Sequence, residues 1–86
     1  MKNNRPLVSV VIPVFNGSVF VEQAVRSVQK STFKNYEILL IDDGSTDRSK
    51  KICRALGKKY DKVRFYAFEK NRGLGRVLNF ALRQAR

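Results

Sequence analysis

Polar side chains follow three short apolar stretches of the chain, and these groups are where chemistry could occur. They are Pro13–Asn16 (PVFN), Asp42–Ser45 (DDGS) and Glu69–Gly73 (EKNRG). Two adjacent carboxylates are costly to keep together, because each disfavours the ionised form of the other. Asp42 could cap the helix that follows. Asp43 is expected to be the first residue free of its strand and to point into a crevice, where its carboxylate could accept hydrogen bonds from a ring N–H or a ribose hydroxyl.

The three apolar stretches predict strands at residues 7–15, 36–41 and about 63–68. The first, LVSVVIPVF, is rich in β-branched residues and almost free of polar ones, which is typical of a strand buried on both faces. Pro13 has no N–H for the ladder, so regular pairing should end near it.

Three helices are predicted from apolar residues at helical spacing. Ser45 or Thr46 is expected to cap the second helix, with Asp47 in its first turn. The only cysteine lies on an apolar stripe, where packing is its expected role. The stripes are Val21, Ala24, Val25 and Val28; Ile52, Cys53, Leu56 and Tyr60; and Leu74, Val77, Leu78, Ala81, Leu82 and Ala85.

This β-α-β-α-β-α order predicts an α/β fold with a parallel sheet, right-handed crossovers and helices on both faces, giving three layers. Ligands of such sheets bind at the carboxyl ends of the strands, where the polar groups are expected. No stop signal follows the last helix, so residues 1–86 are expected to be one partial domain, a fragment of a larger one. At least one sheet edge should be bare, and the chain could form oligomers through it.

The composition excludes several classes of site. With 86 residues, no His and one Cys, the chain can form neither a disulfide nor a structural zinc site, and neither Ser-His-Asp nor Cys-His catalysis. It contains no P-loop, no G-x-G-x-x-G after the first strand and no complete calcium loop. No apolar run is long enough to span a bilayer and no signal region follows the N-terminus, so a cytoplasmic location is expected.

Positive charge is concentrated in the second half of the chain. The net charge is +11, of which residues 1–43 carry +1 and residues 44–86 carry +10. Such a surface attracts phosphate, nucleic acid or acidic lipid headgroups, and it is equally consistent with solvated outer faces of amphipathic helices. Charge alone leaves these alternatives open.

Four segments together resemble the start of the family 2 glycosyltransferases, which have the GT-A fold. The segments are VSVVIPVFN (8–16), EQAVRSV (22–28), YEILLIDDGSTD (36–47) and NRGLGRVLN (71–79). The resemblance covers residues 7–86 and implies the Rossmann-like, nucleotide-sugar-binding N-terminal part of a GT-A domain. The implied enzyme transfers a sugar from a nucleotide donor, commonly a UDP-sugar, to an acceptor hydroxyl with inversion. The sugar, acceptor and linkage are not implied.

The resemblance also implies a set of nucleotide-binding positions. Phe15 matches an aromatic residue that lies against the base, Asp43 matches a residue that hydrogen-bonds the base, and Arg72 lies in a loop near the nucleotide. A fixed guanidinium there would complement diphosphate oxygens. The full set is Pro13, Phe15, Asn16, Asp42, Asp43, Asn71, Arg72 and Gly73.

The chain departs from the family pattern in two respects. Many members read Ala-Arg-Asn where this chain has Val77-Leu78-Asn79, and Arg76 is expected to face outward rather than replace the missing arginine. The family's metal-binding Asp-x-Asp and catalytic base lie beyond the last helix, and these 86 residues contain no Asp-x-Asp. A divalent metal (Mg or Mn) is therefore expected only in the full-length enzyme, and the isolated chain is expected to be inactive.

A basic module that binds nucleic acid or an anionic membrane surface is the alternative function. Its support is the +10 half and the aromatic residues Phe65, Tyr66 and Phe68. Those residues lie in a strand whose faces should be covered, which disfavours base stacking, so no specific nucleic acid is expected. The basic helix surface could also hold the full-length enzyme peripherally at the inner membrane face.

Overall fold

Three parallel strands form the centre of the structure, with β2 between β1 and β3. The computed structural model describes residues 6 and 8–85. The predicted α/β order and parallel sheet are confirmed. In chain order the elements are β1 (Val8–Val14), α1 (Val21–Gln29), β2 (Tyr36–Asp43), α2 (Ser49–Lys59), β3 (Val63–Phe68) and α3 (Leu74–Gln84).

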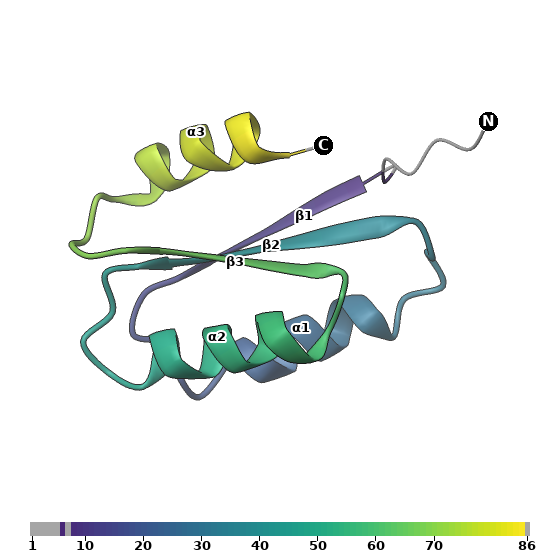
Figure 1. Cartoon of the computed structure of the whole chain (residues 1–86), viewed down its shortest axis with the longest axis horizontal. Helices are drawn as coiled ribbons and strands as arrows, with labels where there is room; N and C mark the ends of the chain where they lie inside the picture. The colour runs from purple at the N-terminus through teal and green to yellow at the C-terminus, as the bar shows by residue number, and fades with distance from the viewer. Residues whose placement is uncertain (1–5, 7, 86) are drawn as a thin grey trace.

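Helices cover both faces of the sheet, as Figure 1 shows: α1 and α2 lie side by side on one face and α3 lies on the other. Because side chains of a strand alternate between faces, β2 contributes Ile38 and Leu40 to one core and Leu39 and Ile41 to the other. All four are fully buried, so β2 is the strand covered on both faces.

β1 is more exposed than expected and ends one residue before the predicted Phe15. Its predicted first residue, Leu7, lies outside the described residues, and it ends at Val14, directly after Pro13. The expectation that β1 is buried on both faces is wrong: most of the strand is half-buried and Val8 is exposed. The reason is its position, because within the described residues β1 pairs only with β2.

α2 begins later than expected, at Ser49. The prediction of a cap at Ser45 or Thr46 is wrong. Asp47 lies before the helix and not in its first turn, and its Oδ1 accepts the Ser49 N–H at 2.8 Å. Asp47 thereby supplies an acceptor for one of the free N–H groups at the start of the helix.

Only part of the apolar face predicted for α3 is buried against the sheet. Val77 and Ala81 are buried, whereas Leu74, Leu78 and Leu82 are 60%, 41% and 76% exposed. In their place the half-buried Phe80 packs against the sheet, with its ring edge-on to two aromatic rings of β3 at centroid distances of 5.1 Å. The helix ends at Gln84, and Ala85 is exposed beyond it.

A polar cluster holds the C-terminal end of α3 to the sheet. Arg64 Nη1 donates to Glu37 Oε1 and to the Gln84 carbonyl, each at 2.8 Å. Ser9 Oγ donates to Glu37 Oε2 at 2.6 Å, which brings β1 into the same cluster. No helix in the described part of the chain is long and apolar enough to cross a membrane.

Candidate functional site

The carboxyl ends of the three strands meet at one edge of the sheet. Asp43, the last residue of β2, is in register with Phe68, the last residue of β3. Pro13 is in register with Ile41, which packs beneath α3. Since alternate residues share a face, Pro13, Asp43 and Phe68 lie on the α3 face, while Asp42 lies on the face covered by α1 and α2. The two adjacent carboxylates are therefore kept apart by the strand itself.

Asp43 does not project freely from the end of β2, and the expectation that it does is wrong. It belongs to the strand and is 4% exposed. Its Oδ1 accepts the Arg72 N–H at 2.8 Å, and its Oδ2 accepts the Gly73 N–H and an Asn71 Nδ2–H, each at 3.0 Å. Three donors compensate the carboxylate for lost hydration, which allows it to be buried. Asp43 thus anchors the β3–α3 loop.

Gly44 allows this loop to pass close to the end of β2. Its φ is +72°, and a Cβ there would lie 2.4 Å from the Asn71 nitrogen and from the Lys70 carbonyl carbon. Gly73, the N-cap of α3, also has a positive φ of 92°, although the space around it is open. Gly44 is required for space and for conformation, whereas Gly73 is required for conformation alone.

Asp42 and Cys53 are buried beneath the start of α2. Asp42 is fully buried; its Oδ2 accepts the Ser45 N–H at 3.0 Å, and its Oδ1 has no hydrogen-bond partner among the described residues. Burial, with the added effect of the charges of Asp42 and Asp47, raises the pKa of the Cys53 thiol to about 12. Cys53 therefore stays protonated and serves as a packing residue.

Asn16 joins the β1–α1 and β2–α2 loops. It has a φ of 51°, and its Oδ1 accepts the backbone N–H groups of Thr46 and Asp47 at 2.8 and 3.3 Å. Its own N–H donates to Ser45 Oγ at 2.9 Å. An asparagine tolerates this left-handed conformation better than most residues. The side-chain oxygen of Asn16 is thus engaged in loop structure.

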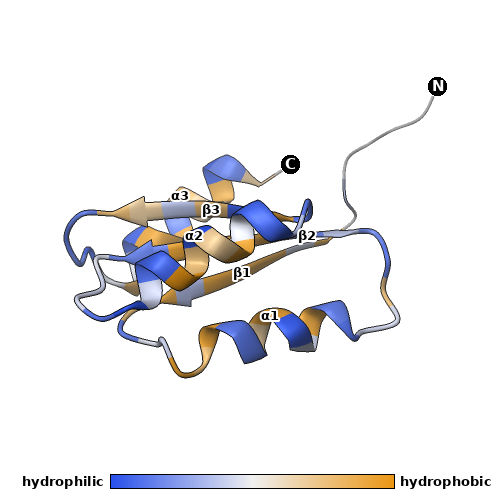
Figure 2. Ribbon diagram, turned by 60° about the horizontal axis from the view of Figure 1, so that its bottom comes forward, coloured by the Kyte–Doolittle hydropathy of each residue, from blue (hydrophilic) through white to orange (hydrophobic). Residues whose placement is uncertain are grey.

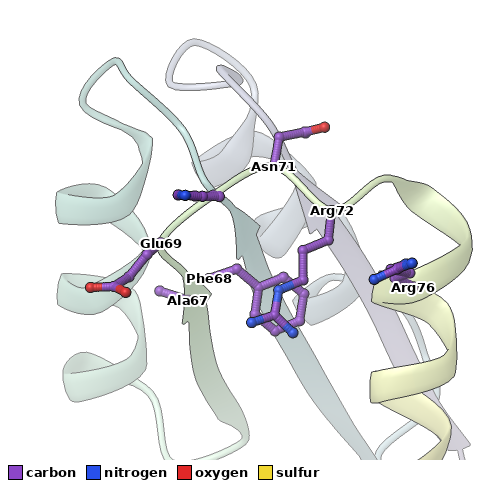
Figure 3. A pocket seen from close by; sticks show the side chains of 7 residues that line it. Ala67, Phe68, Glu69, Asn71, Arg72 and Arg76 are labelled. Atoms are coloured by element: carbon purple, nitrogen blue, oxygen red, sulfur yellow. The ribbon is translucent and has the colours of Figure 1, made fainter.

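Arg72 and Arg76 line a hollow of about 590 Å³ at the end of β3. The Arg72 guanidinium lies 4.5 Å from the centroid of the Phe68 ring. Figure 3 shows Arg72 lying across this ring and Arg76 reaching toward it from the first turn of α3, while Glu69 points away. Arg76 is exposed, as expected for a surface arginine, but it lines this hollow and so lies beside the site rather than away from it. The remaining lining residues are Ala67, Lys70 and Asn71.

Pro13 and Phe15 lie apart from that hollow. Both are exposed, Phe15 by 52%, and both line a smaller hollow of about 230 Å³ beside the start of α1. The first hollow lies at the end of β3 and the second at the end of β1, and β2, which ends at Asp43, is the strand between these two. The expected nucleotide-binding residues therefore form two groups on either side of Asp43.

The site carries two guanidinium groups and an exposed aromatic ring, but its carboxylates do not fit a divalent cation. Among the described residues no three His, Cys, Asp or Glu side chains lie close enough to hold a metal. Asp42 and Asp43 face opposite sides of the sheet, and both accept backbone N–H groups. The arrangement is suited to a planar ring and an anion.

Two contributions at this edge were not evident in the sequence. Phe68 acts as a platform for Arg72, and the only signal for it was that one aromatic residue ends the third strand. For Arg76 the sequence carried no such signal, because Arg72 lies before α3 and the four-residue spacing places side chains together only within a helix.

Two solved structures share this fold, the GT-A fold of glycosyltransferases. A mannosyltransferase from Pyrobaculum calidifontis, determined in complex with GDP-Man and Mn2+, matches with a TM-score of 0.84 at 24% identity, over 95% of this chain and 25% of its own. S. aureus TarS matches with a TM-score of 0.79 at 29% identity, over 92% of this chain and 24% of its own.

The sequence comparisons show the family. The model of glycosyl transferase family 2 matches residues 9–86, and the chain therefore belongs to this family. An uncharacterized glycosyltransferase of Rickettsia typhi is 39% identical over 85 residues, which are 96% of this chain and 26% of that protein. The chain thus spans about a quarter of the length of the proteins that it matches here.

Proposed function

We propose that this chain binds the nucleotide of a sugar donor, of the UDP-sugar type, within a glycosyltransferase. The observation that carries the proposal is the placement of Arg72. Its guanidinium is held over the Phe68 ring at the carboxyl edge of the sheet, and Asp43 fixes its backbone N–H. A fixed guanidinium is a strong partner for diphosphate oxygens, because it can donate two parallel hydrogen bonds. Family membership and the GDP-Man complex of the similar mannosyltransferase support a nucleotide-sugar donor.

The two hollows suggest a division of roles. The exposed ring of Phe15, with Pro13 beside it, would take the base, and Arg72 would take the diphosphate. Asp43 would act by holding the β3–α3 loop in place, and Asn16 by holding the loops on the other side of the sheet. Asp42 would support the turn after β2 through Ser45.

The chemical step would need groups that this chain does not supply. Inverting transfer requires a base that removes the acceptor proton as the sugar carbon leaves the diphosphate. The sequence contains no Asp-x-Asp, and the described carboxylates do not fit a metal. We propose that the metal ligands and the base belong to other parts of the full-length protein, and that the 86-residue chain alone does not transfer sugar.

Amide NMR titration tests the donor assignment. UDP, GDP, ADP and inorganic pyrophosphate would be added in turn at low and moderate salt. UDP should shift resonances near Phe15 and Arg72 more than ADP does, and the shift should survive moderate salt. Arg72→Gln should weaken UDP binding about tenfold, whereas Arg83→Gln, a matched change on the exposed surface of α3, should not. Equal responses to UDP and ADP that salt removes would contradict the proposal.

The alternative function, nucleic-acid binding through stacked bases, is disfavoured by the aromatic residues of β3. These rings are buried or half-buried, and each has a guanidinium near one face. The pairs are Arg54 with Phe65 (5.8 Å), Arg64 with Tyr66 (5.6 Å) and Arg72 with Phe68 (4.5 Å). Bases need an exposed ring face for stacking, and these rings do not provide a row of them.

A further inference from the structure

We propose that the outer surface of the α1–α2 layer binds an anionic lipid membrane. In this arrangement the basic residues of α2 contact lipid headgroups, and the exposed pair Val19 and Phe20 enters the interface beside them. The proposal uses a face of the sheet different from that of Arg72 and does not depend on the donor assignment.

The charge of α2 is the first observation. The helix carries five basic and no acidic residues, and none of the five forms an ion pair with a residue that the structure describes. Cys53 and Leu56 face the core, so the helical period turns Lys51, Arg54 and Lys58 outward. The five basic residues are Lys50, Lys51, Arg54, Lys58 and Lys59.

An exposed apolar pair in the same layer is the second observation. Val19 and Phe20, directly before α1, are 80% and 69% exposed. Val19 lines a hollow on α1 that also contains Lys30 and the ion pair of Arg26 with Glu22 at 3.5 Å, so Lys30 is the unpaired basic side chain beside it among the described residues. In Figure 2 the orange turn before α1 lies on the side of the sheet that carries both helices. The Gly17 N–H donates to the hydroxyl of the first α2 residue at 2.9 Å, which fixes this turn beside α2.

Basic and apolar groups together favour a membrane over a nucleic acid. Interfacial binding draws both on attraction between Lys or Arg and anionic lipids and on burial of apolar side chains below the headgroups. A phosphate backbone would use only the charges, and burying Val19 against it would gain nothing. A lipid surface therefore accounts for both the basic residues of α2 and the exposed apolar pair before α1.

Vesicle co-sedimentation tests the charge contribution. The chain would be mixed with phosphatidylcholine vesicles with and without phosphatidylglycerol. It should bind only the anionic vesicles, and Lys51→Glu/Lys58→Glu should weaken binding by about tenfold or more. Lys34→Glu/Arg83→Glu changes the net charge equally outside α2 and should have a much smaller effect. An equal loss in both variants, with circular dichroism showing both folded, would overturn the proposal.

A single fluorophore tests the apolar contribution without changing the charge. The chain has no tryptophan, so Phe20→Trp reports from that position alone. Anionic vesicles should shift its emission to the blue, and brominated lipids should quench it. An unshifted emission on vesicles would overturn the proposal. Binding to single-stranded RNA would overturn the proposal too, if it were tighter than binding to vesicles and were lost in Lys51→Glu/Lys58→Glu. The basic face of α2 would then be a nucleic-acid surface.

Discussion

The carboxylate of Asp43 accepts the backbone N–H of Arg72 at 2.8 Å, which joins the end of β2 to the loop that carries the exposed guanidinium. This bond links residues 29 positions apart in the sequence. The position of the Arg72 side chain is thus determined by a buried carboxylate on the neighbouring strand as well as by its own contact with Phe68.

Asp43→Asn should destabilise the fold by about 2–3 kcal/mol, because an amide supplies one acceptor oxygen and places an NH₂ group against N–H donors. The free energy of unfolding from urea titration measures the effect. Asp61→Asn, at an exposed position after α2, should change it by less than about 0.5 kcal/mol. Equal stability of the Asp43→Asn and wild-type chains would contradict the anchoring role.

Gly44→Ala and Gly75→Ala should change stability in opposite directions. A Cβ at Gly44 would meet backbone atoms at 2.4 Å at a positive φ, so the loop would have to move and the chain should lose at least about 2 kcal/mol. Gly75 lies in α3 with nothing near its Cβ position, so alanine should add about 0.5–1 kcal/mol through helix propensity. Thermal unfolding of both variants provides the measurement. A stable Gly44→Ala chain would show that the loop is not packed as described.

Asp47 should make the stability of the folded chain decrease at acidic pH. Its hydrogen bond with Ser49, assisted by Ser18, lowers its pKa from 3.8 to about 2. Folding therefore favours the ionised form, and this stabilisation is present above about pH 4 and is lost as pH falls toward 2. The difference in urea midpoint between wild type and Asp47→Asn should be largest above about pH 5 and shrink toward pH 2. A difference that stays constant over this range would contradict the assignment.

Cys53 should be unreactive in the folded chain. Its side chain is fully buried and its pKa is raised to about 12, so little thiolate exists at pH 8. A thiol reagent should label it only after denaturant is added. The matched control is Cys53→Ser/Ala55→Cys, which moves the thiol to an exposed position on the same helix. Labelling of native Cys53 at the rate of the control would refute its burial.

The order and type of the six elements could be predicted from the sequence because apolar spacing reports burial directly. The predictions were wrong where strand pairing, or contacts between residues distant in the sequence, decide burial and the ends of helices. The exposure of β1 depends on how many strands adjoin it, and the start of α2 depends on Asn16, whose side chain binds the backbone just before that helix. The apolar stripe of α3 was broader than the area that the sheet covers, so Leu74 and Leu82 remained exposed.

For the candidate site, the sequence indicated that the polar groups meet at the carboxyl edge of the sheet, but not which of them are buried and hydrogen-bonded. The sequence predicts that Asp43 is free because the apolar run ends at Ile41, and no local pattern shows that a loop 28 to 30 positions later supplies its three donors. The place of Arg76 beside the hollow could not be predicted for a similar reason, because Arg72, its neighbour across the hollow, lies before the helix. Whether the expected residues bind a nucleotide is still a prediction.

Asn16 and Asp43 hold the loops at this edge of the sheet in different ways. The β1–α1 and β2–α2 loops are cross-linked by several hydrogen bonds through Asn16 and two serine hydroxyls, so they should move together as one rigid body. The β3–α3 loop is tied to β2 through Asp43 alone among the side-chain hydrogen bonds of the described residues. Asp43 therefore holds this loop by itself, and loss of its hydrogen bonds would free the loop that carries Arg72 while the other two loops stay joined to each other.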